Sequence, residues 1–205
     1  MKTSLLFING TPPKNLPKTK GYDVIACTDG AFHYLKEKNF PLEKLDFISG
    51  DFDSHEGNDE NIYQEKFIFT PDQDFTDFQK ALEILKNKGV KKVDVFGGSG
   101  GEQDHFLGNL HVAFLFKNDL EITFYDEFSQ YFFLDKHSKF ENIQGKMISL
   151  LPFPIAENII TKGLNWELSN ENLSLTKRIG TRNFAKENAV EISYEKGDLL
   201  IFIEN

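Results

Sequence analysis

Four short segments gather most of the residues that could carry chemistry, and their reactive groups are carboxylates. Facing carboxylates repel one another, so they converge stably mainly when a hard cation neutralises them. Magnesium takes oxygen ligands and is commonly held by one or two carboxylates together with phosphate oxygens. We therefore expect a magnesium–nucleotide site and an enzyme acting on ATP phosphates, with Asp51, Asp53 and Asp77 as metal ligands. The segments are Thr28–Gly30, Gly50–Ser54, Asp72–Asp77 and Gln103–His105.

Short apolar runs precede these segments and predict the elements that position them. Buried parallel strands have this composition, and ligands bind beyond the carboxyl ends of such strands. The acidic loops follow the second, third and fourth runs, which predicts that they meet at one rim. For Asp29 alone, a helix cap is the commoner role of such a residue. The runs are Leu5–Ile8, Tyr22–Cys27, Phe47–Ser49, Phe67–Phe69 and Val93–Phe96.

Helix-period stretches separate several of these runs. After Asp77, apolar residues at positions 78, 81, 82 and 85 form one face, and Thr76 with Gln79 matches a capping box. A second helix is expected to begin near Asp104. Alternating strands and helices predict an α/β fold with an open, mostly parallel sheet and helices on both faces.

The pattern changes beyond about Lys136, where strand-like runs separated by Gly, Asn and Pro replace helical periodicity. We expect an α/β domain over residues 1–136 and an all-β domain over residues 137–205, built as an antiparallel β-sandwich. Met147–Leu151 is one expected strand. Val190–Tyr194 and Leu199–Ile203 are expected to pair as a hairpin.

A glycine-rich run, Gly97–Gly101, lies between an expected strand and the helix near Asp104. Gly97, Gly98 and Ser99 could bring backbone N–H groups to an anion at that helix N-terminus. The run matches neither the dinucleotide fingerprint nor the P-loop, and a flexible turn is the alternative interpretation. Lys80 could contact a phosphate as a point charge, although a solvated helix lysine is the commoner case.

The overall composition excludes several classes of protein. A net charge of -9 and a pI near 5.1 argue against binding the backbone of a nucleic acid, which needs clustered cations. No apolar run approaches the roughly 20 residues of a membrane span. The single cysteine, Cys27, cannot form an intrachain disulfide, and no secretory signal is recognisable, so a cytoplasmic location is expected.

Taken together, these motifs resemble those of thiamine pyrophosphokinases. The match rests on Cys27–Ala31, Gly50–Ser54, Asp72–Leu82 and the Gly-rich segment ending in Asp104–His105, in the family's order and spacing. Thr161–Leu168 resembles the segment that opens the family's C-terminal β-domain. The combination of GDFDS with a later DQDxTD is specific.

The resemblance implies transfer of pyrophosphate from ATP to the hydroxyl of thiamine, giving thiamine diphosphate and AMP. It also implies a homodimer with sites between subunits. Asp51, Asp53 and Asp77 match the magnesium positions, and Lys80 matches a phosphate contact. The residues matching the substrate segments are Gln73, Asp74, Thr76, Asp104, Trp166 and Asn183, with Asp104 as the candidate general base. For Trp166 a core position is an equally weighted alternative.

One position departs from the family pattern. Glu102 stands where many relatives place an arginine, and Arg182 replaces a small serine, so Arg182 could supply the missing guanidinium. The acidic loops alone leave other functions open: a pyrophosphokinase with another acceptor such as a pterin alcohol, a nucleotide hydrolase, or a catalytically silent nucleotide or thiamine binder. The Gly163–Leu168 segment favours thiamine.

Overall fold

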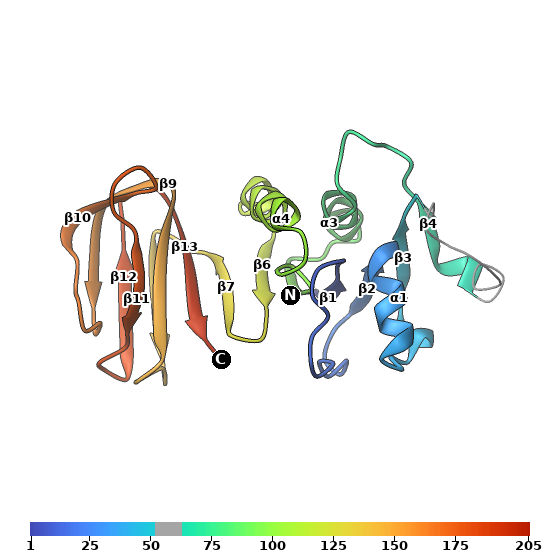
Figure 1. Cartoon of the computed structure of the whole chain (residues 1–205), viewed down its shortest axis with the longest axis horizontal. Coiled ribbons are helices and arrows are strands. Elements are labelled where there is room, and N and C mark those ends of the chain that lie inside the picture. Colours follow the sequence, from blue (N-terminus) through green and yellow to red (C-terminus); the bar gives the residue numbers. More distant parts are fainter. Residues whose placement is uncertain (52–62) are drawn as a thin grey trace. The chain divides into compact units, whose positions relative to one another are not determined.

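The computed structural model describes residues 1–51 and 63–205 and contains two compact units, Met1–Glu127 (unit 1) and Phe128–Asn205 (unit 2) (Figure 1). Asp53, an expected metal ligand, lies outside the described residues. Among the described helices, none is long and apolar enough to cross a membrane.

Unit 1 is built on a sheet of six parallel strands in the order β4-β3-β2-β1-β5-β6. In Figure 1, β1, β2, β3 and β4 lie one after another across this unit. Three strands, β1, β2 and β3, are buried along nearly their whole length, as expected for a sheet covered on both faces. The bounds are β1 Thr3–Phe7, β2 Val24–Thr28, β3 Phe47–Gly50, β4 Phe67–Phe69, β5 Lys92–Phe96 and β6 Glu121–Tyr125.

Helices cover both faces of this sheet, which confirms the predicted α/β architecture. Alternate strand residues point to opposite faces. Phe7 and Cys27 share a buried cluster with Phe32 of α1. Phe124 points to the other face, where its ring lies 5.7 Å from that of Phe78 in α3. The helices are α1 Asp29–Glu37, α3 Asp77–Asn87 and α4 Gln103–Phe116, with short 3-10 turns η1 Leu42–Lys44 and η2 Gln64–Lys66.

The start of α3 is fixed by the predicted cap. The Thr76 side chain accepts a hydrogen bond from the backbone N–H of Gln79 at 3.2 Å, which satisfies one of the free donors of the first turn. Phe78, Ala81, Leu82 and Leu85 are all buried, so the apolar face predicted from the sequence faces the sheet. This start places Asp77 at the first helical position, beside the carboxyl ends of the strands.

Unit 2 is entirely antiparallel in its described pairings, which confirms the predicted change of architecture. The 16-residue strand β9 pairs with β10, β11, β12 and β13. The bounds are β7 Ser129–Phe133, β8 His137–Glu141, β9 Met147–Lys162, β10 Ser169–Ser174, β11 Gly180–Phe184, β12 Ala189–Ser193 and β13 Lys196–Glu204.

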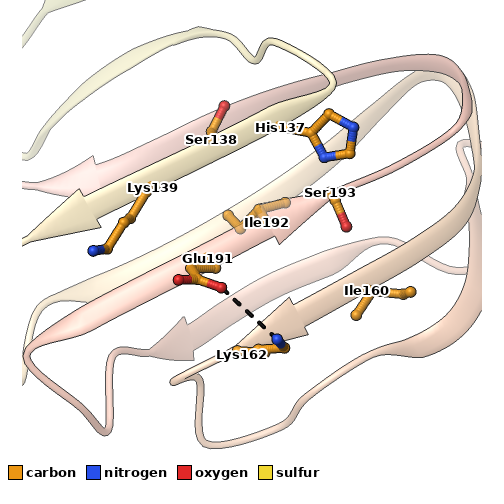
Figure 2. A pocket seen from close by; sticks show the side chains of 8 residues that line it. All are labelled: His137, Ser138, Lys139, Ile160, Lys162, Glu191, Ile192 and Ser193. Atoms are coloured by element: carbon orange, nitrogen blue, oxygen red, sulfur yellow. Dashed lines mark ion pairs between the residues drawn. The ribbon is translucent and has the colours of Figure 1, made fainter.

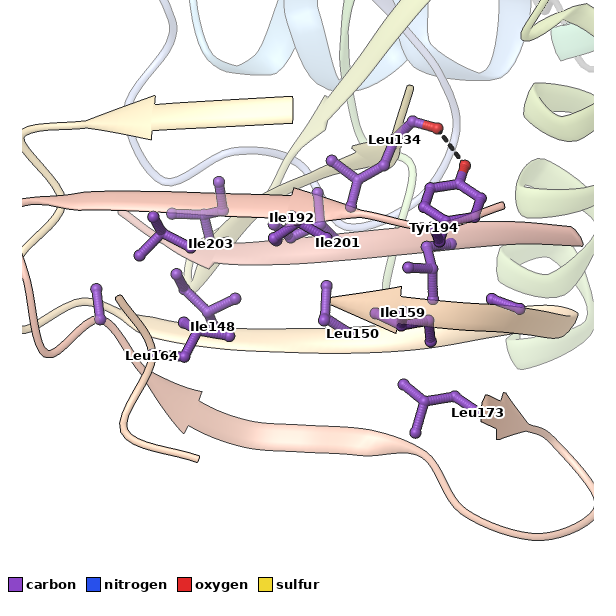
Figure 3. Close-up of a cluster of buried hydrophobic side chains, with 14 of the residues drawn as sticks. Leu134, Ile148, Leu150, Ile159, Leu164, Leu173, Ile192, Tyr194, Ile201 and Ile203 are labelled. Carbon is purple, nitrogen blue, oxygen red and sulfur yellow. Dashed lines mark hydrogen bonds between the residues drawn. The ribbon is translucent and has the colours of Figure 1, made fainter. Parts of the chain in front are cut away.

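Aliphatic side chains from several strands form the core of unit 2 (Figure 3). Ile148 and Ile159 of β9 meet Ile192 of β12 and Ile201 of β13 there. At the edge of this core the Tyr194 hydroxyl donates a 2.6 Å hydrogen bond to the carbonyl of Leu134. Burial and the nearby Asp198 carboxylate raise the pKa of Tyr194 to about 12.

The predicted hairpin between Val190–Tyr194 and Leu199–Ile203 is wrong. Both strands pair with β9 instead: β12 with residues 160–162 and β13 with residues 148–157. The backbone N–H of Glu195 donates to the carbonyl of Glu157, so the ladder continues through the connection. Gly197, at φ 74°, bends the chain where a Cβ would lie 1.9 Å from the carbonyl oxygen of Ile155. Gly197 therefore marks a kink in β13, which runs beside β9, and not a turn that reverses the chain.

Candidate functional site

A hollow of about 460 Å³ lies in unit 1, lined by the loops that follow β1, β2, β3 and β4 and by the first turns of α3 and α4. These are the carboxyl ends of parallel strands, the expected place for a ligand. The structure brings many of the predicted site residues together here. Those lining the hollow are Asp29, Asp51, Gln73, Asp74, Thr76, Asp77, Lys80 and Asp104.

Negative charge dominates the lining of the hollow. It carries five aspartates and a single lysine, Lys80, together with His105. Like charges held this close disfavour one another's ionised form unless a cation shares them. The hollow is therefore suited to a metal cation or to an anion that arrives with one.

Asp29 is the most enclosed of these aspartates, at 6% exposure. It opens α1, and its Oδ1 accepts the backbone N–H of Gly30 at 2.7 Å. A Cβ placed on Gly50 would lie 2.1 Å from Asp29 Oδ2, so only glycine fits against this carboxylate. Burial and then Asp29 raise the pKa of the Cys27 thiol well above its ordinary value, which keeps Cys27 neutral and unreactive.

The side chains of Asp51 and Gln73 are joined directly. Gln73 Nε2 donates a 2.8 Å hydrogen bond to Asp51 Oδ2. The amide nitrogen of Gln73 is thus turned toward Asp51, and its oxygen is the group that could accept from a substrate hydroxyl. The contact also ties the predicted metal ligand to the loop between β4 and α3.

Lys80 is anchored by three oxygens of its own chain. Its ammonium donates to the carbonyls of Thr70 at 2.9 Å and Asp72 at 3.1 Å, and it lies 2.8 Å from Asp77 Oδ1. An ammonium has three N–H donors, so these contacts use all of them. Only 10% of the side chain is exposed. Lys80 therefore holds the β4–α3 loop and Asp77 in place.

The glycine-rich run is shaped by its packing against the chain after β1. Gly97 has φ 79°, and a Cβ there would lie 2.1 Å from the carbonyl oxygen of Ile8. The Gly98 carbonyl accepts from Asn109, and the Ser99 hydroxyl donates to Asp126. Of the run, Gly100 lines the hollow. Gly97, Gly98 and Ser99 are not among the residues that line it, and their nucleotide contact stays a prediction.

The N-terminus of α4 brings Asp104 and His105 to the same hollow. Asp104 Oδ1 accepts the backbone N–H of His105 at 2.9 Å. The imidazole Nε2 of His105 lies 3.6 Å from the carboxylate of Glu102. Glu102 thus faces a histidine of the site.

Two predicted substrate residues lie in unit 2 and are bonded to each other. Asn183 Oδ1 accepts the backbone N–H of Trp166 at 3.1 Å, and Asn183 Nδ2 donates to the Trp166 carbonyl at 2.8 Å. The indole packs edge to face on Phe184, with ring centroids 5.7 Å apart, yet 62% of Trp166 is exposed. The core alternative for Trp166 is therefore not what the structure shows: the ring is presented outward.

A second hollow, of about 420 Å³, lies on β8, β9 and β12 of unit 2 (Figure 2). The pairing register aligns Lys139, Glu191 and Lys162 in one row, and Glu191 lies 3.9 Å from Lys162. None of the predicted site residues lines it. It holds two lysines and one glutamate, and exposed ion pairs of this kind are ordinary on a solvated sheet face.

Carboxylate oxygens are the candidate metal donors of the hollow in unit 1. Within residues 1–51 and 63–205, no three Asp, Glu, His or Cys side chains are arranged to hold a metal ion. Asp53 falls outside that range. The donors present in the hollow, Asp29, Asp51 and Asp77, are hard oxygen ligands of the kind that suits magnesium.

Several residues of the lining were not among the predicted site residues. Asn9 and Gly10 follow β1, Thr28 ends β2, and Asn109 belongs to α4. None lies in an acidic segment except Thr28, which stands directly before Asp29. The general rule on strand ends could have found Asn9 and Gly10, because they follow the first predicted strand.

Two family models match the chain. The model described as "Thiamin pyrophosphokinase, catalytic domain" matches residues 18–124, and the one described as "Thiamin pyrophosphokinase, vitamin B1 binding domain" matches residues 136–199. The first match lies in unit 1 and the second in unit 2.

Curated relatives are similar over most of the chain. A thiamine pyrophosphokinase of Bacillus subtilis (strain 168) is 27% identical over 98% of this chain and 98% of its own length. Thiamine pyrophosphokinase 3 of Oryza sativa subsp. japonica is 27% identical over 97% of this chain and 85% of its own length. Thiamine pyrophosphokinase 1 of the same plant is 30% identical, but the match spans 73% of this chain and 62% of that protein.

Solved structures share the fold. The thiamine pyrophosphokinase of Bacillus subtilis superimposes with a TM-score of 0.83 at 21% identity, covering 100% of this chain and 99% of the other. A family protein of Enterococcus faecalis gives a TM-score of 0.84 at 23% identity, with coverage of 100% and 99%.

Proposed function

Because the chain belongs to the thiamine pyrophosphokinase family, its activity is that of a thiamine pyrophosphokinase, and we propose that the acidic hollow of unit 1 performs it on a magnesium–ATP complex. The observation that supports this most is the meeting of Asp51 and Asp77, from separate loops, in one strongly acidic hollow. A polyphosphate could enter it only with a cation.

The reaction joins the hydroxyl oxygen of thiamine to the β-phosphorus of ATP, breaks the bond from that phosphorus to the oxygen bridging the α-phosphate, and releases AMP with that oxygen. When bound, magnesium would neutralise charge on the phosphate oxygens during the transfer. Asp51 and Asp77, together with Asp53, would hold it. Asp51 is steadied by Gln73, and Asp77 is steadied by Lys80.

The acceptor hydroxyl needs an orienting acceptor and a base. The Gln73 oxygen could receive the hydroxyl proton as a hydrogen bond, which would orient the nucleophile. The hydroxyl has only one proton, so it would turn from Gln73 to Asp104, which lines the same hollow, and Asp104 could take that proton as the bond forms. Asp74 and Thr76 lie in the same stretch of lining. Thr76 caps α3, so its hydroxyl has a structural role in addition to any contact with substrate.

Unit 2 would bind thiamine through Trp166. The thiazolium of thiamine is a cation, and an exposed indole face attracts a cation. Asn183 holds the backbone of Trp166 by two hydrogen bonds, so its role in thiamine binding is to present the ring. In a homodimer with sites between subunits, the Trp166 of one copy would serve the acidic hollow of the other.

Incubation with ATP, magnesium and thiamine tests the activity. AMP and thiamine diphosphate should form together, only with all three present, and a chelator should stop the reaction. AMP formed without thiamine would point to a hydrolase. Reaction only with a pterin alcohol would assign another acceptor, and binding without turnover would favour the silent binder.

Mixing two inactive variants tests whether sites lie between subunits. Asp77→Asn damages unit 1 and Trp166→Ala damages unit 2. If each site combines unit 1 of one copy with unit 2 of its partner, a mixed dimer keeps one intact site and activity returns on mixing. If each copy works alone, every site in the mixture stays damaged and no activity returns.

Arg182 is the candidate for supplying the guanidinium contact to phosphate that Glu102 cannot make. It adopts φ 57°, an uncommon backbone conformation for a residue other than glycine. Its backbone N–H donates to the Ser149 hydroxyl at 3.0 Å. Strained backbone of this kind is enriched at functional sites. Arg182→Ala should weaken ATP binding or turnover, and unchanged ATP kinetics would refute the assignment.

A further inference from the structure

A buried hydroxyl without a partner lines the acidic hollow. Thr28 is 2% exposed and belongs to the lining. Its Oγ1 has no hydrogen-bond partner within the described structure. Most buried polar side chains do have a partner, and a group left without one calls for an explanation.

The helix that follows does not use this hydroxyl. Thr28 is the N-cap residue of the nine-residue helix α1, in extended conformation at φ -77° and ψ 159°. A threonine there usually accepts a backbone N–H of the first turn, but its side chain makes no capping bond. The hydroxyl is thus free to donate at a helix N-terminus, where the backbone favours a negative ligand.

Three other side-chain donors of the hollow already have acceptors within the chain. Gln73 donates to Asp51, Lys80 donates to two carbonyls and pairs with Asp77, and Asn109 donates to the carbonyl of Gly98. Thr28 differs from these three residues. Its hydroxyl has no acceptor in the described structure, and a ligand in the hollow could supply one.

We propose that the Thr28 hydroxyl donates a hydrogen bond to an oxygen of the polyphosphate bound in this hollow. The proposal rests on the function proposed above and adds to it a residue outside the acidic positions and the lysine. Negative oxygen is the ligand chemistry favoured at the start of α1. The aspartates of the lining are themselves acceptors, but none in the described structure accepts a hydrogen bond from Thr28 Oγ1.

Replacement by valine separates this role from a structural one. Thr28→Val keeps the shape and removes a hydroxyl that has no partner in the ligand-free protein. Its melting temperature without ligand should therefore equal or exceed that of the wild type. Ser4→Ala is the matched control. Ser4 is fully buried and its Oγ also has no partner in the described structure, but it lies near the N-terminal end of β1, whereas the hollow lies at the carboxyl ends of the strands.

Calorimetry would measure the binding of two probes, each with magnesium: α,β-methylene ATP, which cannot be cleaved at the reacting bond, and inorganic tripolyphosphate. Thr28→Val should raise Kd for both by about tenfold or more, the value of a hydrogen bond to a charged acceptor. Thr28→Ser, which keeps the hydroxyl, and Ser4→Ala should both stay close to the wild-type Kd.

Three results would overturn the proposal: an unchanged Kd for Thr28→Val, a lower melting temperature of this variant without ligand, or weakened binding of the ATP analogue alone. The last would assign the contact to the nucleoside. If the wild-type protein bound neither probe, the proposed function itself would fail, and this outcome is distinguishable because it precedes any comparison of variants.

Discussion

The carboxylate of Asp77 lies 2.8 Å from the ammonium of Lys80, one turn further along α3. The same ammonium donates to the carbonyls of Thr70 and Asp72. A cation that the motif suggested for phosphate contact is therefore the clamp of the loop that carries Gln73. An anchor of the loop and a phosphate ligand should respond differently to replacement of Lys80.

Replacing Lys80 should affect folding as well as catalysis. Lys80→Met leaves a carboxylate and two carbonyls without their donor, so we expect the free energy of unfolding to fall by about 2 kcal/mol. Turnover should drop because Asp77 and Gln73 lose their support. Thermal unfolding of the ligand-free protein and steady-state kinetics measure the two effects.

Lys86 on the same helix provides the control. It pairs with Asp119 at 2.8 Å on the surface, and exposed pairs contribute little. Lys86→Met should leave unfolding and kinetics close to wild type. If Lys80→Met raised only the KM for ATP, with unfolding unchanged, Lys80 would be a phosphate ligand after all.

Gly50 should tolerate no side chain. A Cβ there would lie 2.1 Å from Asp29 Oδ2 and 2.7 Å from Asp29 Cβ, so Gly50→Ala must displace a buried carboxylate or the strand. We expect a loss of about 1–3 kcal/mol in the free energy of unfolding, measured in urea.

The matching control is Gly108→Ala. Gly108 lies inside α4 with no atom near the added Cβ, and alanine there should stabilise the protein by about 0.5–1 kcal/mol. A Gly50→Ala protein as stable as the wild type would mean that Asp29 can leave its position at no cost.

Thiamine binding should be visible in tryptophan fluorescence. Trp166 is the single tryptophan of the chain and is 62% exposed, so contact with the thiazolium should quench its emission. Asn183→Ala removes both hydrogen bonds to the Trp166 backbone. The quenching titration should then shift to higher thiamine concentration by about tenfold, the cost of losing one to two such bonds.

The control for this titration is magnesium–ATP alone, which should leave the emission unchanged if the indole serves thiamine only. Emission that does not respond to thiamine in the wild type would remove Trp166 from the thiamine site. Quenching that is identical in Asn183→Ala would show that the ring needs no anchor.

The stability of unit 2 should depend on alkaline pH through Tyr194. Burial raises the pKa of Tyr194 from 10.0 to about 12. The unfolded chain therefore releases the proton first, and the stabilisation is complete below pH 10 and lost as the pH rises toward 12.

Tyr194→Phe isolates this effect. Near neutral pH the variant should be less stable by about 1 kcal/mol, because the Leu134 carbonyl loses its donor. Between pH 10 and 12 the gap to the wild type should close, since only the wild type has that proton to lose. Urea unfolding at stepped pH measures the gap, and a constant gap up to pH 12 would contradict the assignment.

Local pattern was enough to predict much of unit 1. The short apolar runs became β1 to β5, and Thr76 with Gln79 capped α3 as expected. These features depend on neighbours within one turn or one strand, which a sequence records directly.

Long-range pairing was beyond that reach. The expected hairpin between Val190–Tyr194 and Leu199–Ile203 failed because both strands found the same distant partner, β9. The anchoring contacts of Lys80 were not predicted for a related reason, while its phosphate contact stays a prediction. Its contacts with Thr70 and Asp72 depend on how a loop folds back over a helix, and no spacing rule encodes that.

The site was predicted best where charge carried the signal. Carboxylates after successive strands indicated the hollow, because parallel strands end at one rim. Thr28 carried no such signal, since a threonine beside a helix start is ordinarily read as a cap. Its missing partner could be recognised only in three dimensions.

The long strand β9 gives unit 2 a property that belongs to no single contact. Four strands pair with it, so all four of these ladders break when β9 is released. Local opening at an edge can free β10 or β11 alone, but release of β9 leaves only the separate pairs β8–β12 and β7–β13, and isolated two-stranded pairs are marginally stable in water. Amide protons of its central residues should accordingly exchange with solvent only through complete unfolding, at the slowest rates in the unit.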